Sequence, residues 1–181
     1  MILYLRGDEM ALRQVRIDGD PLLRKKSREV KEVNDHIREL IDDLFDTMYE
    51  EEGVGIAAPQ VGVLRRIFVV DDREGNKLAL INPQLETSGE EQEAMEACLS
   101  VPNMQGVVTR KGKVKVSYLD ENGEEQSLET DTFLARIIQH ENDHLDGVLY
   151  TDRASKVYTM EEIEAMEKEQ EKQREERGEN S

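Results

Sequence analysis

Residues 131–147 read DTFLARIIQHENDHLDG, and this stretch predicts the helix around which the rest of the chain is organised. Its apolar residues recur at three- and four-residue spacing, namely Phe133, Leu134, Ile137, Ile138 and Leu145. That spacing is typical of one apolar face of an amphipathic helix. Gly147 supplies a C-terminal stop. We therefore expect a helix over about Asp131 to Asp146.

Within this helix, residues 140–144 read HENDH, an HExxH motif. His140 and His144 are four residues apart, so their Cβ atoms lie on the same helix face about 6 Å apart. Two neutral imidazoles at that spacing can hold one metal ion, and Glu141 is placed to act on a water at that ion.

The motif also extends the apolar face of the helix. Glu141 and His144 continue the line that contains Ile137 and Leu145, whereas Asn142 and Asp143 are expected to point away from it. A carboxylate buried beside two imidazoles is unfavourable unless something compensates its charge. A divalent cation does so, and the sequence therefore predicts a metal-binding helix.

A tetrahedral catalytic site needs a third protein ligand and one open position. A third His at position 150 would complete a metzincin pattern, but Tyr150 stands there, and His36 lies opposite the apolar face of another predicted helix. A gluzincin-type site could instead use one of three acidic residues in the C-terminal tail: Glu161, Glu162 or Glu164. The remaining candidate is Cys98, the only cysteine, whose sulfur would complete a Cys-His-His site.

The rest of the chain predicts one α+β domain with antiparallel strands packed around the central metal-binding helix. Another amphipathic helix begins at the N-cap Asn34 and ends before Gly53. Strands are expected at residues 67–70, 78–81, 107–108 and 114–119, with a stop at Asn82-Pro83 and a hairpin turn at Asn122-Gly123. The expected divisions are an N-terminal extension over 1–9, which is an upstream start or a non-native segment, a catalytic domain over 10–158 and an acidic helix or tail over 159–181.

Charge and composition exclude several classes of protein. The 181 residues include 24 basic and 41 acidic side chains, a net charge of −17 that is the wrong sign for a general nucleic-acid-binding surface. One cysteine cannot form an intrachain disulfide. Charge-free stretches such as residues 53–64 are shorter than the roughly 20 residues of a membrane helix, and we see no signal peptide. We therefore expect a cytoplasmic protein that does not bind membranes.

Three segments, in order, resemble the motifs of peptide deformylases. Residues 53–60 read GVGIAAPQ, similar to GxGxAAxQ; residues 96–100 read EACLS, similar to EGCLS; and residues 139–147 read QHENDHLDG, similar to QHExDHLxG. The segment DGDPLLR at 18–24 also resembles the N-terminal part of the family, so the likeness covers roughly residues 11–155. Ala97 departs from the pattern by replacing a Gly, which matters only where the backbone needs a positive φ.

The resemblance implies an enzyme that hydrolyses the N-formyl group from the first methionine of new polypeptides and releases formate. It implies that Cys98, His140 and His144 hold one divalent metal ion. This ion is expected to be Fe(II) in a cell of bacterial or organellar type, and Zn, Ni or Co could also occupy the site. Glu141 would then transfer the proton of the attacking water, while the Gln60 side chain and the Leu99 backbone N–H would stabilise the oxyanion.

Substrate-binding residues are expected on both sides of this centre. Gly53 and Gly55 would let their loop approach the substrate backbone closely, and an apolar pocket for the methionine side chain would be formed by Val54, Phe133 and Ile137. The expected partners are N-formyl-methionyl nascent peptides. Residues 161–181 contain nine Glu against four Lys or Arg, a net charge of −5, so we expect no ribosome contact through this tail.

Three other functions remain open at this point. A gluzincin-type metallopeptidase would keep its metal after Cys98→Ala. A Cys-His hydrolase would use Cys98 as the nucleophile and survive chelation. A non-enzymatic binding module would be inert toward formyl-methionyl peptides.

Overall fold

The computed structural model describes residues 12–177, so the predicted N-terminal extension 1–9 lies outside the described residues. The helices are α1 (Asp35–Glu50), α2 (Phe133–Leu145), α3 (Tyr150–Arg153) and α4 (Met160–Glu176), with 3-10 turns η1 (Pro21–Arg24) and η2 (Ala58–Val61). The strands are β1 (Gly55–Ala57), β2 (Ile67–Asp71), β3 (Lys77–Cys98), β4 (Val101–Leu119), β5 (Glu125–Thr130) and β6 (Lys156–Thr159). The predicted division at residues 158 and 159 stays a prediction.

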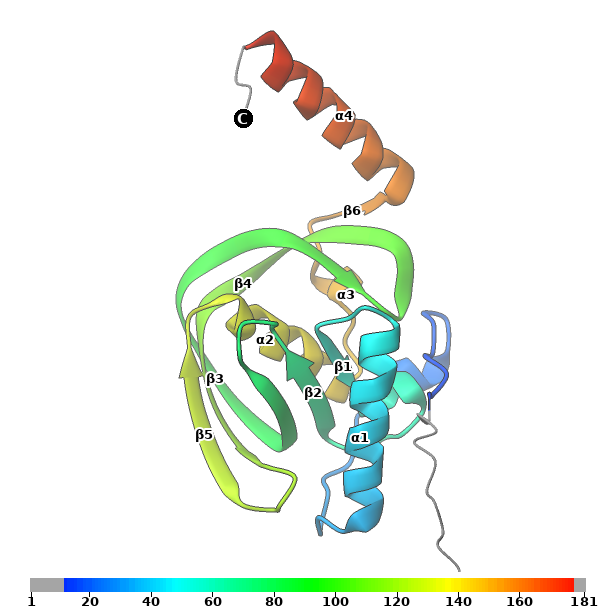
Figure 1. Cartoon of the computed structure of the whole chain (residues 1–181), viewed down its shortest axis with the longest axis vertical. Coiled ribbons are helices and arrows are strands. Elements are labelled where there is room, and N and C mark those ends of the chain that lie inside the picture. The colour runs from blue at the N-terminus through cyan, green and yellow to red at the C-terminus, as the bar shows by residue number, and fades with distance from the viewer. Residues whose placement is uncertain (1–11, 178–181) are drawn as a thin grey trace, which may run out of the picture.

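One curled antiparallel sheet carries the fold. Its strands follow the order β1-β2-β3-β4-β5, and β6 pairs with β4 off this path. Figure 1 shows the long β3–β4 hairpin curving over α2, while α1 lies beside β1 and β2. The predicted α+β class, the single domain and the antiparallel strands are therefore confirmed.

The β3–β4 hairpin is longer than the sequence pattern indicates. The predicted strands at 78–81, 107–108 and 114–119 are parts of these two strands, and Asn82-Pro83 does not end β3. Asn82 adopts a φ of 50°, and the register shifts between Ile81 and Gln84. The Asn82 side-chain amide donates to the backbone oxygen of Val30 and accepts from its N–H, both at 2.8 Å. Because these bonds hold the left-handed residue in place, the strand continues through a bulge instead of stopping.

Helix α1 follows the prediction closely. Asn34 accepts a hydrogen bond from the Ile37 N–H at 3.1 Å, which satisfies one of the free donors of the first turn. The face toward β1 and β2 is buried through Leu40, Ile41, Leu44 and Met48. This packing confirms the predicted amphipathic helix.

Helix α2 starts two residues later than predicted because Thr132 is its cap and accepts from the Leu134 N–H at 3.3 Å. Leu134, Ile137, Ile138 and Leu145 are buried in a second cluster with residues of β2, β3 and β4. Phe133, assigned to the same stripe by its spacing, is instead 59% exposed. As the first helical residue it lies at the edge of the packed region.

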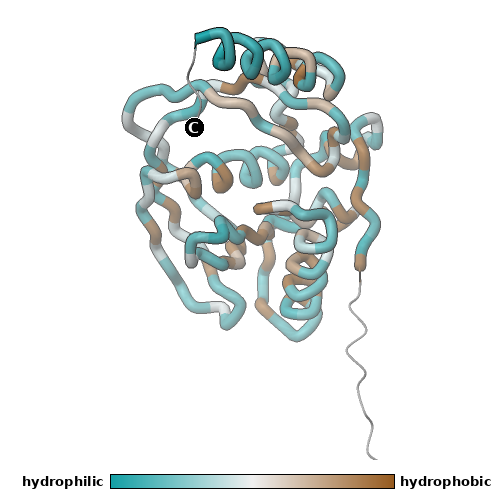
Figure 2. The backbone as a smooth tube through the Cα atoms, turned by 45° about the horizontal axis from the view of Figure 1, so that its top comes forward, coloured by the Kyte–Doolittle hydropathy of each residue, from teal (hydrophilic) through white to brown (hydrophobic). Residues whose placement is uncertain are grey.

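Helix α4 extends away from the rest of the molecule, as Figure 1 shows. Its capping box joins Thr159 and Glu162, and of its described residues Ile163 is the buried one. Figure 2 shows that the helix is mostly hydrophilic along its length. No helix within residues 12–177 is both long and apolar enough to cross a membrane.

Candidate metal centre and its cavity

The tip of the β3–β4 hairpin brings Cys98 to helix α2. Cys98 is the last residue of β3, and its Sγ lies 3.4 Å from Nε2 of His144. The ligand atoms of Cys98, His140 and His144 all lie within 4.8 Å of one another. Among the described residues they form the one group of three or more His, Cys, Asp or Glu side chains with this geometry.

The alternative ligands lie elsewhere. His36 is on α1 with a side chain that is 93% exposed. Glu161, Glu162 and Glu164 are exposed residues of α4, and Glu162 is occupied by the capping box, where it accepts from the Thr159 N–H at 2.8 Å. The described structure therefore brings no tail glutamate to the two histidines.

His140 is held by a carboxylate that the sequence analysis did not single out. Its Nδ1 lies 3.0 Å from Oε2 of Glu96, which leaves Nε2 available to bind a metal ion. Glu96 is buried and also accepts from Arg110 at 2.6 and 2.9 Å and from Arg136 at 2.7 Å. Burial alone would raise the pKa of Glu96, but the hydrogen bonds from Arg110 and His140 outweigh it and lower the pKa to about 2. Glu96 is therefore a carboxylate that orients the imidazole.

The position of Asp143 in the helix predicted that its side chain would point away from the buried region. In the structure it does not. It is 8% exposed, accepts from Arg110 at 2.9 Å, and accepts twice from Arg153, at 2.6 and 2.8 Å. The prediction was wrong because it assumed one buried helix face, whereas the curled sheet and α3 cover a second face. Arg110 thus links Asp143 to Glu96, and through Glu96 to His140.

Glu141 is buried beside these ligands, with 4% exposure, and its Oε2 has no hydrogen-bond partner within the described residues. Burial raises its pKa to about 7. A Cβ at Gly55 would lie 2.6 Å from Oε1 of Glu141, so only glycine lets the β1 backbone pass this close. This observation gives Gly55 a specific role, which is to leave room for the carboxylate.

Gln60 approaches the cysteine from the opposite side. Its Oε1 accepts from the Ala57 N–H at 2.9 Å, and its Nε2 lies 3.1 Å from Oγ of Ser100 and 3.5 Å from Sγ of Cys98. The first bond fixes which end of the amide faces the cysteine. A side-chain N–H donor is therefore directed at the centre.

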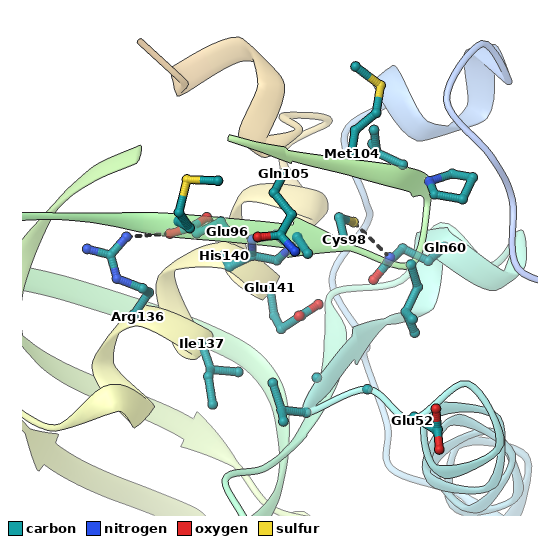
Figure 3. Close-up of a pocket in the computed structure, with 18 of the residues that line it drawn as sticks. Glu52, Gln60, Glu96, Cys98, Met104, Gln105, Arg136, Ile137, His140 and Glu141 are labelled. Atoms are coloured by element: carbon teal, nitrogen blue, oxygen red, sulfur yellow. Dashed lines mark hydrogen bonds and ion pairs between the residues drawn. The ribbon is translucent and has the colours of Figure 1, made fainter. Parts of the chain in front are cut away.

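A cavity of 440 Å³ opens onto this centre. It is lined by ten of the eleven site residues that the sequence analysis named: Gly53, Val54, Gly55, Gln60, Cys98, Leu99, Phe133, Ile137, His140 and Glu141. His144, the eleventh, is 1% exposed. Figure 3 shows Glu141, Gln105 and Gln60 directed at the same space, with Cys98 beside Gln60.

Ala97 is an exposed residue of the cavity wall. The non-glycine residues with positive φ in the described structure are Glu52, Arg73, Asn82 and Asn103. Ala97 is not among them, so its methyl group is accommodated without backbone strain.

The donors fit a divalent cation. Burial lowers the pKa of His144 well below its ordinary value, so this imidazole is neutral, as a ligand must be. Burial also lowers the pKa of His140, but hydrogen bonds with Cys98 and Glu96 outweigh it and raise the pKa to about 10. A cation at the site would replace that proton. One sulfur and two imidazoles suit iron, zinc, nickel and cobalt alike.

Comparison with known proteins agrees with this geometry. The family model described as Polypeptide deformylase matches residues 12–160. A peptide deformylase from Finegoldia magna is 48% identical over 159 residues, which is 87% of this chain and 98% of the relative.

Two solved structures are similar in fold. The peptide deformylase of Synechococcus elongatus in complex with actinonin is 40% identical, with a TM-score of 0.78 over 86% of this chain and 85% of that one. A Met-Ala-Ser-bound peptide deformylase of Acinetobacter baumannii is 36% identical, with a TM-score of 0.76 over 80% of this chain and 99% of that one.

Proposed function

The chain belongs to the peptide deformylase family, and from that premise we propose that it hydrolyses the N-formyl group of formyl-methionyl nascent peptides and releases formate. The observation that carries the proposal is the joint placement of the Cys98-His140-His144 group, Glu141 and Gln60 around one cavity. The Met-Ala-Ser bound to the Acinetobacter baumannii relative begins with methionine, as the product of this reaction would.

We propose that Cys98, His140 and His144 hold one divalent ion, with Fe(II) expected in the cell. When bound, the ion would supply Lewis acidity that lowers the pKa of a water and polarises the formyl carbonyl. Thiolate ligation also makes the centre sensitive to oxidation if iron is native. Glu96 keeps the His140 ring oriented through the 3.0 Å contact at Nδ1.

Glu141 carries the proton. Its unpartnered Oε2 accepts the proton of the attacking water and then donates it to the leaving amine nitrogen. The carboxylate is buried and packed closely against the backbone of Gly55, which limits its movement during the reaction.

Gln60 stabilises the oxyanion that forms as water attacks the formyl carbon. Its Nε2–H donates to that oxygen while the Ala57 N–H holds the other end of the amide. We assign the Leu99 backbone N–H to the same oxygen on the strength of the family resemblance.

The methionine side chain occupies the apolar part of the cavity. Val54, Phe133 and Ile137 are its proposed contacts, and all three line the cavity that holds Glu141. Gly53 and Gly55 leave the adjacent backbone accessible to the substrate.

We propose a cytoplasmic location, where nascent chains are made. The net charge of −5 over residues 161–181 is expected to disfavour contact with ribosomal RNA. Cosedimentation of the full chain with ribosomes at physiological salt, lost when residues 161–181 are removed, would contradict this expectation.

The test is an anaerobic assay of formate release from formyl-Met-Ala, with metal analysis of the same sample. We expect stoichiometric metal and formate release, and no release of acetate from acetyl-Met-Ala as a matched control. Full metal occupancy without formate would refute the proposed function. Retention of full metal by Cys98→Ala would refute the proposed ligand set.

A further inference from the structure

Three methionines from three different elements line the catalytic cavity. Met95 belongs to β3, Met104 to β4 and Met160 to the first turn of α4. They are 40%, 36% and 37% exposed, whereas Glu141 in the same cavity is 4% exposed. The methionines therefore belong to its outer, solvent-facing part. Unbranched thioether side chains adapt to differently shaped apolar groups.

Met160 is held in place although α4 itself extends away from the body. Thr159 pairs with Met104 across the β6–β4 ladder, so the next residue lies beside the cavity. The Thr159–Glu162 capping box fixes the start of the helix, and Ile163, at 7% exposure, anchors its first turn. Met160, the residue of α4 that lines the cavity, is thus held at a defined place in its wall.

The strand β6 also pairs with part of the cavity wall. Between the pairs Glu96–Gly106 and Cys98–Val101, β4 places four residues opposite the single residue Ala97. These four, residues 102–105, bulge into the cavity wall and all line it. β6 pairs with two of them, Met104 and Gln105. The C-terminal segment is therefore paired directly with half of the bulge.

Gly106 allows α3 and β6 to approach β4 closely next to the bulge. A Cβ at Gly106 would lie 2.8 Å from the Tyr150 ring and 2.9 Å from Cβ of Ala154. The absence of a side chain at this position lets α3 and the following β6 pack directly against β4.

We infer that residues 156–163 hold Met160 in the outer wall of the substrate site and that Met160, with Met95 and Met104, binds apolar side chains of the second and third peptide residues. This inference rests on the proposed function. One cavity contains Cys98, Glu141 and the three methionines, so a peptide with its formyl group at the centre can extend past them. The match to the family model ends at residue 160, and so α4 lies almost wholly beyond it.

The chain offers a matched pair of variants. Met166 is on the same helix and is 36% exposed, close to the 37% of Met160, but it does not line the cavity. We compare Met160→Ala with Met166→Ala, and use Met160→Leu as the conservative variant. The kinetic substrates are formyl-Met-Leu-Phe and formyl-Met-Ala-Ser, and the ligands for calorimetry are the corresponding unformylated peptides.

We expect the wild-type chain to favour the apolar peptide in kcat/KM and in binding. Met160→Ala should reduce that preference by roughly threefold to tenfold, because about two side-chain groups lose their partial burial. Met160→Leu should restore most of the preference. Met166→Ala should keep the wild-type preference.

The inference is overturned if Met160→Ala keeps the wild-type preference, or if Met166→Ala reduces it equally. Calorimetry with the unformylated peptides distinguishes a failure of this inference from a failure of the proposed function. If neither substrate releases formate, only the proposed function is contradicted. The inference is then decided by whether Met160→Ala reduces the preference in peptide binding.

Discussion

Helices α1 and α2 are both capped and amphipathic, but their buried polar side chains differ in hydrogen bonding. The buried polar residues of α1, Asp43 and Thr47, both bind Arg13, through a side-chain contact of 2.7 Å and a backbone N–H contact of 3.0 Å. In α2, by contrast, Oε2 of Glu141 and Nδ1 of His144 are buried without a partner in the described structure.

The difference separates a structural helix from a functional one. A buried polar group with a partner adds a net hydrogen bond, whereas one without a partner loses its hydration and gains nothing in return. Glu141 lies in the wall of the cavity, where the proposed reaction uses its carboxylate. Hydrophobic periodicity alone does not distinguish the two helices, but the hydrogen-bond partners of their buried polar residues do.

The largest expected effect concerns metal binding by the two helices. His144→Gln removes a proposed metal ligand of α2 and should weaken metal affinity by more than about 100-fold, beyond the 10- to 100-fold typical of residues that only orient a ligand. His36→Gln on α1 changes an exposed imidazole and should bind metal like the wild type. Competition with a chelator measures both, and one equivalent of tightly held metal in His144→Gln would contradict the comparison.

Glu141→Gln tests whether the unpartnered carboxylate of α2 moves a proton. Amide and carboxylate have nearly the same shape, so the variant should keep its metal. We expect kcat for formate release to fall by about 10²- to 10⁴-fold, the usual contribution of a general acid–base group. A decrease below tenfold at full metal occupancy would assign the proton transfer to another group.

For α1 we expect the complementary result, which is a lower free energy of unfolding with unchanged activity. Leu44 is fully buried between α1 and the sheet. Leu44→Ala should lower the free energy of unfolding by about 2–5 kcal/mol, measured by urea titration. Activity per folded molecule should match the wild type. Asp42→Ala, an exposed change on the same helix, should alter stability by at most about 0.5 kcal/mol.

The predictable parts of this molecule are those in which the signal is local. Asn34, the α1 stripe and the HExxH spacing of α2 are all contained within a few turns of helix, and the structure has them as expected. The strand β6 and the short helix α3 were missed because each has only four residues, too few to establish a period.

The missed polar residues depend on long-range register. Arg110 meets Glu96 across the hairpin and Asp143 across the sheet-to-helix contact, 14 and 33 residues away. Neither pairing is visible in the sequence until the β3–β4 register, with its three shifts, is known. The same register explains why the outward orientation predicted for Asp143 was wrong.

Glu96→Gln tests how strongly metal binding by α2 depends on the contacts that Glu96 makes with Arg110 and His140. The variant removes the carboxylate that orients His140 and leaves Arg110 with one acidic partner fewer. We expect metal affinity to fall by about 10- to 100-fold. Glu93→Gln, an exposed change on the same strand, is the matched control. Equal affinities for the two variants would show that packing alone orients His140.

The smallest expected effect compares the caps of the two helices. Asn34 caps α1 and Thr132 caps α2, each through one side-chain oxygen. Asn34→Ala and Thr132→Ala should each lower the free energy of unfolding by about 1 kcal/mol. Neither should change metal affinity, because Thr132 lies two helical turns before His140 and the His140 ring is held by Glu96. If Thr132→Ala weakened metal binding while Asn34→Ala did not, the two ends of α2 would act as one unit, and its chemistry would depend on the whole helix.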